Sequence, residues 1–430
     1  MINYKRENKV VLLTLALLSF YIPADYVLPA KLYLLWEMGY IGVTLVSLIF
    51  LVIYHIKQVK PHYILFMMYY GWMLFGSQLF VIKRTVPLST LLFIFFRCAG
   101  YITVLELTFM SLPKKKAVQC YLDAGMLASV AYFLSFILYA GKEGGMRNGQ
   151  AVEFAGMGMM KTDQNWFLLT YDNESPFYFI PIAVALLYYT WYYDKKKKGL
   201  CITYFLILFI MYISKMAATA LVAITAFTAG LLYYYSVMNG NKRKMKIKTA
   251  KFGFTYWRVI IVGFILNIFI VLLPSSTLGV RVAEYFGKDS TYSGRTIIWE
   301  NCIRYIKKSL LFGNGYEGAD IKMVKIGQTH CHNLLVEHLY LGGAILLGLF
   351  LLVIISSAPK RNDTFAALLF SAALFTFFLD AALDWLPTKS YIMAIFVLNY
   401  YLNDTQETDW YFIIRSLFSK KKRRKWKWVK

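Results

Sequence analysis

The segment HCHNLLVEHLYLGG, residues 330–343, contains three of the chain's five histidines. An imidazole titrates near neutral pH, so a histidine here can act as a general base or as a metal ligand. On a helix, His332 and His338 are separated by about 240° of rotation, which argues against a shared metal ion. His332 opens an apolar run, and Asn333 beside it can orient a substrate hydroxyl or cap a helix. His332 and Asn333 can also simply satisfy the backbone groups at a helix N-terminus.

A second candidate group comes shortly before this segment, in RTIIWENCIRYIKKSLLFGNGYEG, residues 295–318. Apolar residues recur there at helical spacing: Ile298, Cys302, Ile306 and Leu310. Trp299 and Ile303 lie beside this row. The spacing predicts an amphipathic helix at the outer membrane interface. The glycines of FGNG suit a left-handed turn that ends the helix. Arg295 opens the helix, and it can face the same outer cavity as His332.

The elements that position these residues are predicted to be membrane helices. The chain has 430 residues, of which 59% are hydrophobic, and its mean hydropathy is +0.51. Its apolar runs are about 20 residues long, enough to cross a bilayer, and lipid offers no partner for the backbone of an open sheet. We therefore predict an all-α, polytopic integral membrane protein with about twelve transmembrane helices. The predicted spans are residues 10–23, 32–54, 62–82, 86–109, 117–140, 175–193, 199–213, 216–238, 257–274, 333–355, 364–384 and 388–402.

The positive charge is concentrated in short loops, which sets the predicted orientation. Lysine- and arginine-rich segments precede the first span or follow even-numbered spans: YKRENK, LPKKKA, DKKKKG, NKRKMKIKTAK and PKR. Such segments face the cytoplasm, so we expect both termini there. The net charge of +24 follows from this bias and from attraction to anionic lipid, and requires no nucleic acid. Lys31 and the Lys-Arg pair at 83–84 are small exceptions on the outer side.

The predicted organisation is one membrane domain, residues 1–430. It has a first long outer loop at 141–174, a second at 275–332 with the interfacial helix, and a basic amphipathic cytoplasmic tail at 403–430. Long loops in a compact protein are usually functional or disordered. The five cysteines show no paired spacing, so no disulfide framework is predicted. Cys98, Cys120, Cys201 and Cys302 are interpreted as small apolar residues that fill space between helices.

The ordered pattern SGRTIIW, SLLFGNGY and HCHNLLVEHLYLGG, between Ser293 and Gly343, resembles that of the O-antigen ligase/polymerase superfamily of bacterial membrane glycosyltransferases. TDQNWF at 162–167 is similar to the family's Asp-Pro-Asn element, and SKMAAT at 214–219 to its Ser-Arg element. Three departures stand out. Lys215 replaces the usual arginine, Gln164 replaces the proline, and His330 is additional. The best-matching part covers about an eighth of the chain, but its elements occur in the family's order.

The resemblance implies a glycan donor on a polyprenyl diphosphate and transfer to a sugar hydroxyl on the outer face, with no cofactor and no metal. It assigns the base to His332 and diphosphate binding to Arg295 and Lys215, with Asn333 and Asn165 in support. These residue types suit the task, because the leaving diphosphate needs cations and the attacking hydroxyl needs a base. Expected partners are the glycan donor, the glycan acceptor, membrane lipid, and the flippase and chain-length regulator of the same pathway.

Further ionisable residues within the spans are also candidates. Arg97 either pairs with a buried acid such as Asp123 or lines the substrate cavity. His338 and Glu337 form either a functional pair or a structural one. Asp380 and Asp384, at the outer end of their span, can contact acceptor sugar or balance the cations.

Several other function classes remain as alternatives. A ligase would differ from a polymerase mainly in its acceptor. A flippase or transporter for lipid-linked sugar would show inverted halves, and no such symmetry is visible. A metal-dependent glycosyltransferase would need paired carboxylates in the first outer loop, where only Asp25 occurs. A purely structural membrane protein would leave Arg295 and His332 without a role.

The topology can be tested by labelling single cysteines in a cysteine-free background. Cysteines placed near Lys288 and Gln328 should react with a membrane-impermeant thiol reagent in intact cells, and one near Lys246 should not, because basic loops stay in the cytoplasm. The reverse labelling pattern would contradict the orientation and every role that depends on it.

Overall fold

The computed structural model describes most of the helical part of the chain. The described residues are 2–21, 27–80, 86–139, 141–142, 145–146, 152–154, 158–160, 166–170, 175–215, 255–273, 281, 295–359, 365–381 and 390–403. Predictions that fall on residues 216–238 and on the tail from residue 404 lie outside them.

The regular structure of the described residues is almost entirely helical, as predicted. The helices are α1 (Ile2–Leu18), α2 (Ala30–His55), α3 (Pro61–Gly71), α4 (Leu88–Ser111), α5 (Lys114–Tyr139), α6 (Ser175–Tyr192), α7 (Lys198–Lys215), α10 (Tyr256–Leu272), α12 (Arg295–Lys308), α13 (Ala319–Ile326), α14 (Leu334–Ser356), α15 (Phe365–Ala381) and α16 (Ser390–Leu402). A small antiparallel hairpin joins β1 (Val152–Phe154) to β2 (Gly158–Met160), with Glu153 opposite Met159.

Within the described residues, four helical segments are long and apolar enough to cross a bilayer: residues 30–58, Leu88–Ser111, Lys114–Tyr139 and Leu334–Ser356. Four shorter apolar helices accompany them: Phe177–Tyr192, Tyr256–Leu272, Ala366–Phe378 and Tyr391–Leu402. These helices fit a membrane protein, while the count of twelve spans remains a prediction. The predicted span 62–82 is less regular than expected, because α3 ends at Gly71 and continues as a π-turn, Trp72–Gly76, and a 3-10 turn, Ser77–Phe80.

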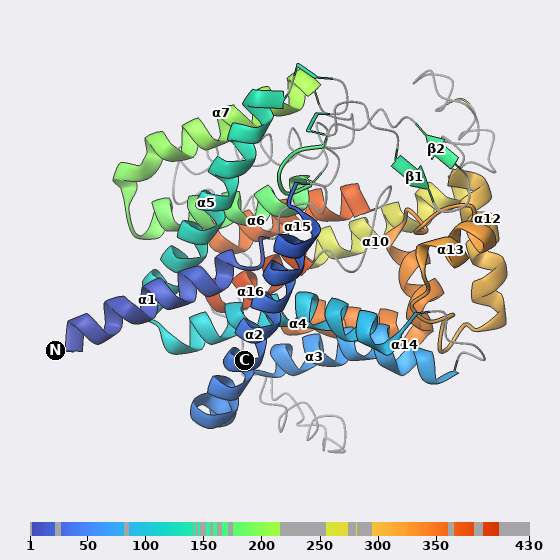
Figure 1. The fold of residues 1–430 in the computed structure, drawn as a ribbon, viewed down its shortest axis with the longest axis horizontal. Helices are drawn as coiled ribbons and strands as arrows, with labels where there is room; N and C mark the ends of the chain where they lie inside the picture. The colour runs from blue at the N-terminus through green and yellow to red at the C-terminus, as the bar shows by residue number, and fades with distance from the viewer. Residues whose placement is uncertain are drawn as a thin grey trace, which may run out of the picture.

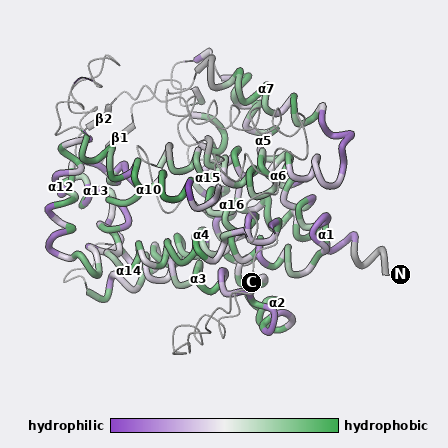
Figure 2. Tube along the Cα trace, turned by 180° about the vertical axis from the view of Figure 1, so that it is seen from behind, coloured by the Kyte–Doolittle hydropathy of each residue, from purple (hydrophilic) through white to green (hydrophobic). Residues whose placement is uncertain are grey.

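Polar residues gather at the two ends of the molecule. Figure 1 shows α12 and α13 at one end, and the N-terminus and the turn between α6 and α7 at the opposite end. Hydrophobic residues predominate along the helices between these ends, for example along α3, α4 and α10 (Figure 2). The basic segments YKRENK and DKKKKG therefore lie at the same end of the molecule, as the charge pattern predicts.

The predicted amphipathic helix is α12. Ile298, Trp299, Cys302 and Ile306, which belong to the predicted apolar face, are buried. Leu310, the last residue of the predicted apolar row, lies beyond the end of the helix, and its side chain is 58% exposed. The helix ends at Lys308, so Leu310 lies in the following turn and no longer follows the helical repeat.

Helix α14 is broken in its N-terminal half, where the turn formed by residues 309–315 packs against it. Gly343 has φ 66° and ψ −161°, which interrupts the helical backbone. The turn supplies the missing hydrogen bonds. The amides of Asn314 and Gly315 donate to the carbonyls of Tyr340 and Leu341 at 2.7 and 2.9 Å. The amide of Ala344 donates to the Leu310 carbonyl at 2.8 Å, so the break leaves these backbone groups paired.

The close approach of these two backbones explains the two glycines that face each other. A Cβ atom on Gly343 would lie 2.3 Å from the Leu311 carbonyl oxygen, and one on Gly313 would lie 2.5 Å from the Gly342 nitrogen. Both residues also have a positive φ, which side chains other than glycine rarely adopt. The indole of Trp72, in the π-turn that follows α3, donates to the Gly342 carbonyl at 2.9 Å and fixes the break from the other side.

The break can be tested with two alanine substitutions in the same helix. Gly343→Ala should destabilise the protein by about 2–4 kcal/mol, because it adds a left-handed strain and a backbone clash. Gly348→Ala is the matched control, since no atom lies within 4 Å of its new Cβ. The measurement is the thermal midpoint of the purified protein in detergent, and equal midpoints for the two variants would contradict this account of the break.

Candidate functional site

One hydrogen bond joins α12, the helix that begins at Arg295, to the histidine segment, residues 330–333. The Trp299 indole donates to the Cys331 carbonyl at 2.9 Å, and both residues are buried. Arg295 is one turn before Trp299, so the two share a face of α12. Cys331 immediately precedes His332. The predicted cation and the predicted base therefore lie on elements that are held together directly.

His332 has an unusual backbone conformation. Its φ of 51° makes it the one residue other than glycine with a positive φ in the part of the chain that the structure describes. Backbone strain of this kind is frequent at functional sites. The His332 ring lies 3.8 Å from the His330 ring, centroid to centroid, and both residues are half-buried. The strained turn thus presents two imidazoles side by side at the mouth of α14.

Asn333 is the N-cap of α14, which confirms the capping interpretation. Its Oδ1 accepts hydrogen bonds from the amides of Leu335 and Val336 at 3.1 and 3.2 Å. Its Nδ2 donates to the Asn267 carbonyl on α10 at 3.1 Å. The Asn267 side chain in turn donates to the Phe378 carbonyl on α15 at 3.1 Å. A buried chain of amides thus ties the start of α14 to two neighbouring helices.

The Glu337 carboxylate holds the histidine segment in place through two contacts. Its Oε1 accepts from Lys322 Nζ on α13 at 2.7 Å, and its Oε2 accepts from the Cys331 amide at 2.6 Å. Both charged side chains are almost fully buried. Burial opposes the charge of Lys322, but the Glu337 carboxylate outweighs it and raises the pKa of Lys322. Buried charges in this arrangement are costly to separate, so the segment between His330 and Asn333 is held rigidly.

A second buried carboxylate holds the turn that precedes α13. Glu317 is paired with Lys325, and it accepts a hydrogen bond from the Tyr340 hydroxyl at 2.7 Å. The neighbouring Tyr316 carbonyl accepts from Gln78 Nε2 at 2.6 Å. These contacts connect α13 and the turn before it to α14 and to the 3-10 turn Ser77–Phe80.

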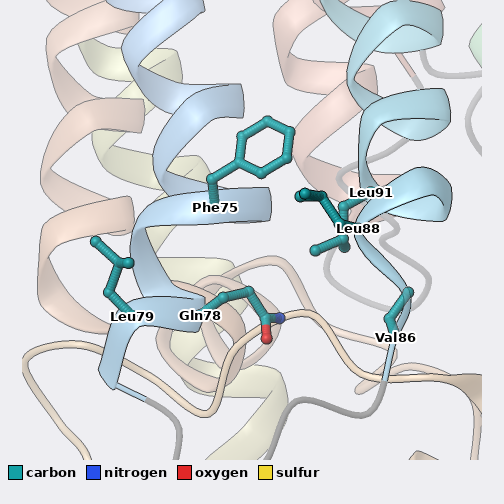
Figure 3. Close-up of a pocket in the computed structure, with 6 residues that line it drawn as sticks. All are labelled: Phe75, Gln78, Leu79, Val86, Leu88 and Leu91. Atoms are coloured by element: carbon teal, nitrogen blue, oxygen red, sulfur yellow. The ribbon is translucent and has the colours of Figure 1, made fainter.

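An apolar pocket opens beside this turn, with a volume of about 140 Å³. Figure 3 shows Phe75 and Gln78 on one segment facing Leu88 and Leu91 on the other. Leu79 and Val86 complete the lining. The Gln78 amide is engaged with Tyr316, so the pocket has hydrocarbon character. It contains neither His332 nor Arg295.

His338 and Glu337 have different partners. The His338 Nδ1 atom lies 2.7 Å from the Leu334 carbonyl, which can only accept, so Nδ1 carries a proton. Nε2 lies 2.9 Å from the Tyr69 hydroxyl, which donates to it in the neutral imidazole. Nε2 thus links α14 to α3, while Nδ1 bonds within α14, and the engagement of both nitrogens favours a structural role for this buried histidine.

Arg97 interacts electrostatically with several tyrosines, among them Tyr391, Tyr178 and Tyr33. It also acts on the carboxyl group of Glu37. Asp123 instead interacts with Lys197 and Lys116, near the turn between α6 and α7. Arg97 keeps part of its side-chain surface accessible although it lies in the middle of α4, which fits a residue that lines an internal space.

The other predicted site residues are placed only in part. Lys215 is the last residue of α7, but its side chain lies outside the described part of the structure, as does that of Asp380 in α15. Asn165 and Asp384 lie outside the described residues altogether. Among the described residues, no group of three histidine, cysteine or acidic side chains is close enough to hold a metal ion.

The sequence analysis missed Lys322, Asn267 and Tyr69. A single asparagine within the apolar run of α10 was a usable signal, because polar residues in spans tend to be buried and paired. No comparable signal marks Lys322. It lies in the short polar helix ADIKMVKI, between SLLFGNGY and HCHNLLVEHLYLGG, where a lysine is expected to be exposed.

Comparison of the chain with protein-family models, with curated proteins and with solved structures finds no match. The interpretation of the site therefore depends on its residues and their geometry, together with the resemblance of the motif.

The buried pair can be tested by removing one charge and then both. Lys322→Met should destabilise the protein by about 3–5 kcal/mol, because Glu337 loses its counter-ion in a buried position. Glu337→Gln keeps an acceptor for the Cys331 amide, so the double variant Lys322→Met/Glu337→Gln should recover part of the loss. The measurement is again the thermal midpoint in detergent. A double variant no more stable than Lys322→Met would contradict the pairing.

Proposed function

We propose that the protein is a membrane glycosyltransferase that polymerises oligosaccharide units carried on a polyprenyl diphosphate, on the outer face of the cytoplasmic membrane of a bacterium. The observation that supports the proposal is the hydrogen bond from the Trp299 indole to the Cys331 carbonyl. It joins α12, which begins at Arg295, to the residue that precedes the strained backbone of His332. A cation and a base at the mouth of an apolar helix match the two needs of this transfer.

In the proposed reaction, His332 accepts the proton of the attacking acceptor hydroxyl. The acceptor oxygen forms a bond to the anomeric carbon of the donor, and the bond from that carbon to the diphosphate oxygen breaks. Arg295 and Lys215 balance the charge that develops on the leaving diphosphate. A guanidinium can grip two phosphate oxygens, whereas a lysine acts as a point charge.

The surroundings of the site support a substrate that is lipid-linked. The apolar pocket between residues 75–79 and the start of α4 adjoins the turn that contains Tyr316. Its lining suits the hydrocarbon chain of the donor and offers little to a sugar. The exposed Leu79 and Leu88 at its edge leave it open towards the apolar surface of the helices.

A ligase that transfers the glycan to another acceptor would use the same base and the same cations. The two activities differ in the acceptor, and we favour polymerisation because such enzymes occur in envelopes with or without an outer membrane. A flippase needs no base, so the strained His332 beside His330 argues for chemistry rather than transport.

The base can be removed with little change to the backbone. Asparagine tolerates a positive φ better than most residues, so His332→Asn should accumulate in the membrane at the normal level. Polymer formation should fall by a factor of about 10²–10⁴, as expected on loss of a general base. His330→Ala should be milder, and His338→Ala should lower stability more than turnover, because His338 joins Tyr69 to α14.

The measurement is the amount and length of polymer at matched membrane levels, with added chelator as a further control that should leave the unmodified enzyme unaffected. Full-length polymer from the His332→Asn protein would refute the assignment of the base.

A further inference from the structure

Two cysteines meet at the site, although they are 29 residues apart in the chain. Cys302 lies on α12 and Cys331 lies between the two histidines, and both side chains are fully buried. Cys302 is close enough to Cys331 to act on the pKa of its thiol. The other three cysteines, Cys98, Cys120 and Cys201, lie within α4, α5 and α7.

The backbone around Cys331 is held in place from two sides. Trp299, three residues before Cys302 on α12, donates to the Cys331 carbonyl at 2.9 Å. Glu337 accepts the Cys331 amide at 2.6 Å. Trp299 and Cys302 are three residues apart and so are neighbours on one helix surface. The bond from Trp299 to the Cys331 carbonyl therefore holds Cys331 beside the part of α12 that carries Cys302. Two buried cysteines held close together on fixed elements need little movement to reach disulfide geometry.

We propose that Cys302 and Cys331 form an intramolecular disulfide that pins the His330–His332 segment to α12. The bond requires an oxidising compartment, so the proposal depends on the outer location of α12 and not on the reaction catalysed. It gives the two thiols a role that spacing along the sequence does not indicate.

The oxidation needs an acceptor for two electrons, and a thiol–disulfide oxidase of the outer compartment supplies it. One cysteine thiolate attacks the oxidase disulfide and forms a mixed disulfide, and the other thiolate then displaces the oxidase. The two cysteine thiols lose two protons and two electrons, and the oxidase disulfide becomes a dithiol.

The bond should form before the segment is buried. Burial raises the pKa of the Cys331 thiol, and its contact with Cys302 and the nearby Glu337 carboxylate raise this pKa further. In the folded protein the thiol is therefore mostly protonated and reacts slowly, since the thiolate is the reactive species. Oxidation during folding avoids this barrier.

The test counts free thiols in the full-length protein in its own membrane. Cells are quenched with acid, and the denatured protein is treated with a polyethylene-glycol maleimide before or after reduction. The proposal predicts three added tags without reductant and five with reductant, on a chain that runs as a monomer in both cases. Five tags without reductant would overturn the proposal.

Two single variants identify the partners. Cys302→Ser should give four tags without reductant, because Cys331 is released, and Cys331→Ser should give four because Cys302 is released. Cys120→Ser is the matched control and should give two. Two tags from Cys302→Ser would show that Cys331 pairs with another cysteine of the chain and would also overturn the proposal. The count on the unmodified chain does not depend on how any variant folds.

Discussion

The backbone hydrogen bonds between the 309–315 turn and the broken helix α14 hold together the end of the molecule that contains α12 and α13. Carbonyls of Tyr340 and Leu341 that the helix leaves unused accept from the turn, and the amide of Ala344 donates back to it. In a membrane protein an unpaired backbone group is costly, so neither segment is stable in this form without the other. The position of α13, the start of α14 and the histidine segment all follow from this exchange.

Side chains of α12, α13 and α14 hold the histidine segment in position. Lys322 on α13 reaches Glu337 on α14, and Glu337 holds the Cys331 amide. Trp299 then fastens Cys331 to α12. Each link is buried, and each joins elements that are separate in the sequence. The strained backbone of His332 persists because the residues on both sides of it are fixed, which is how proteins maintain strain at a functional position.

Much of the fold was predictable, because the apolar runs and the helical spacing of Ile298, Cys302 and Ile306 are local signals. The N-cap role of Asn333 was also predictable, as one of two alternatives. The partners of Glu337, His338 and Arg97 were not. Which ionisable groups meet is decided by how distant helices pack, and one sequence carries no record of such pairs. The break at Gly343 was missed for the same reason, since its cause lies in the preceding turn.

The interlocked turn also makes the assembly of this region sequential. The 309–315 turn is synthesised before α14, so its partners are absent when it leaves the ribosome. The first part of α14, from Leu334 to Gly342, gains its full set of backbone partners only when it meets that turn. The pairing of turn and helix is therefore completed only after the whole of this stretch has been made.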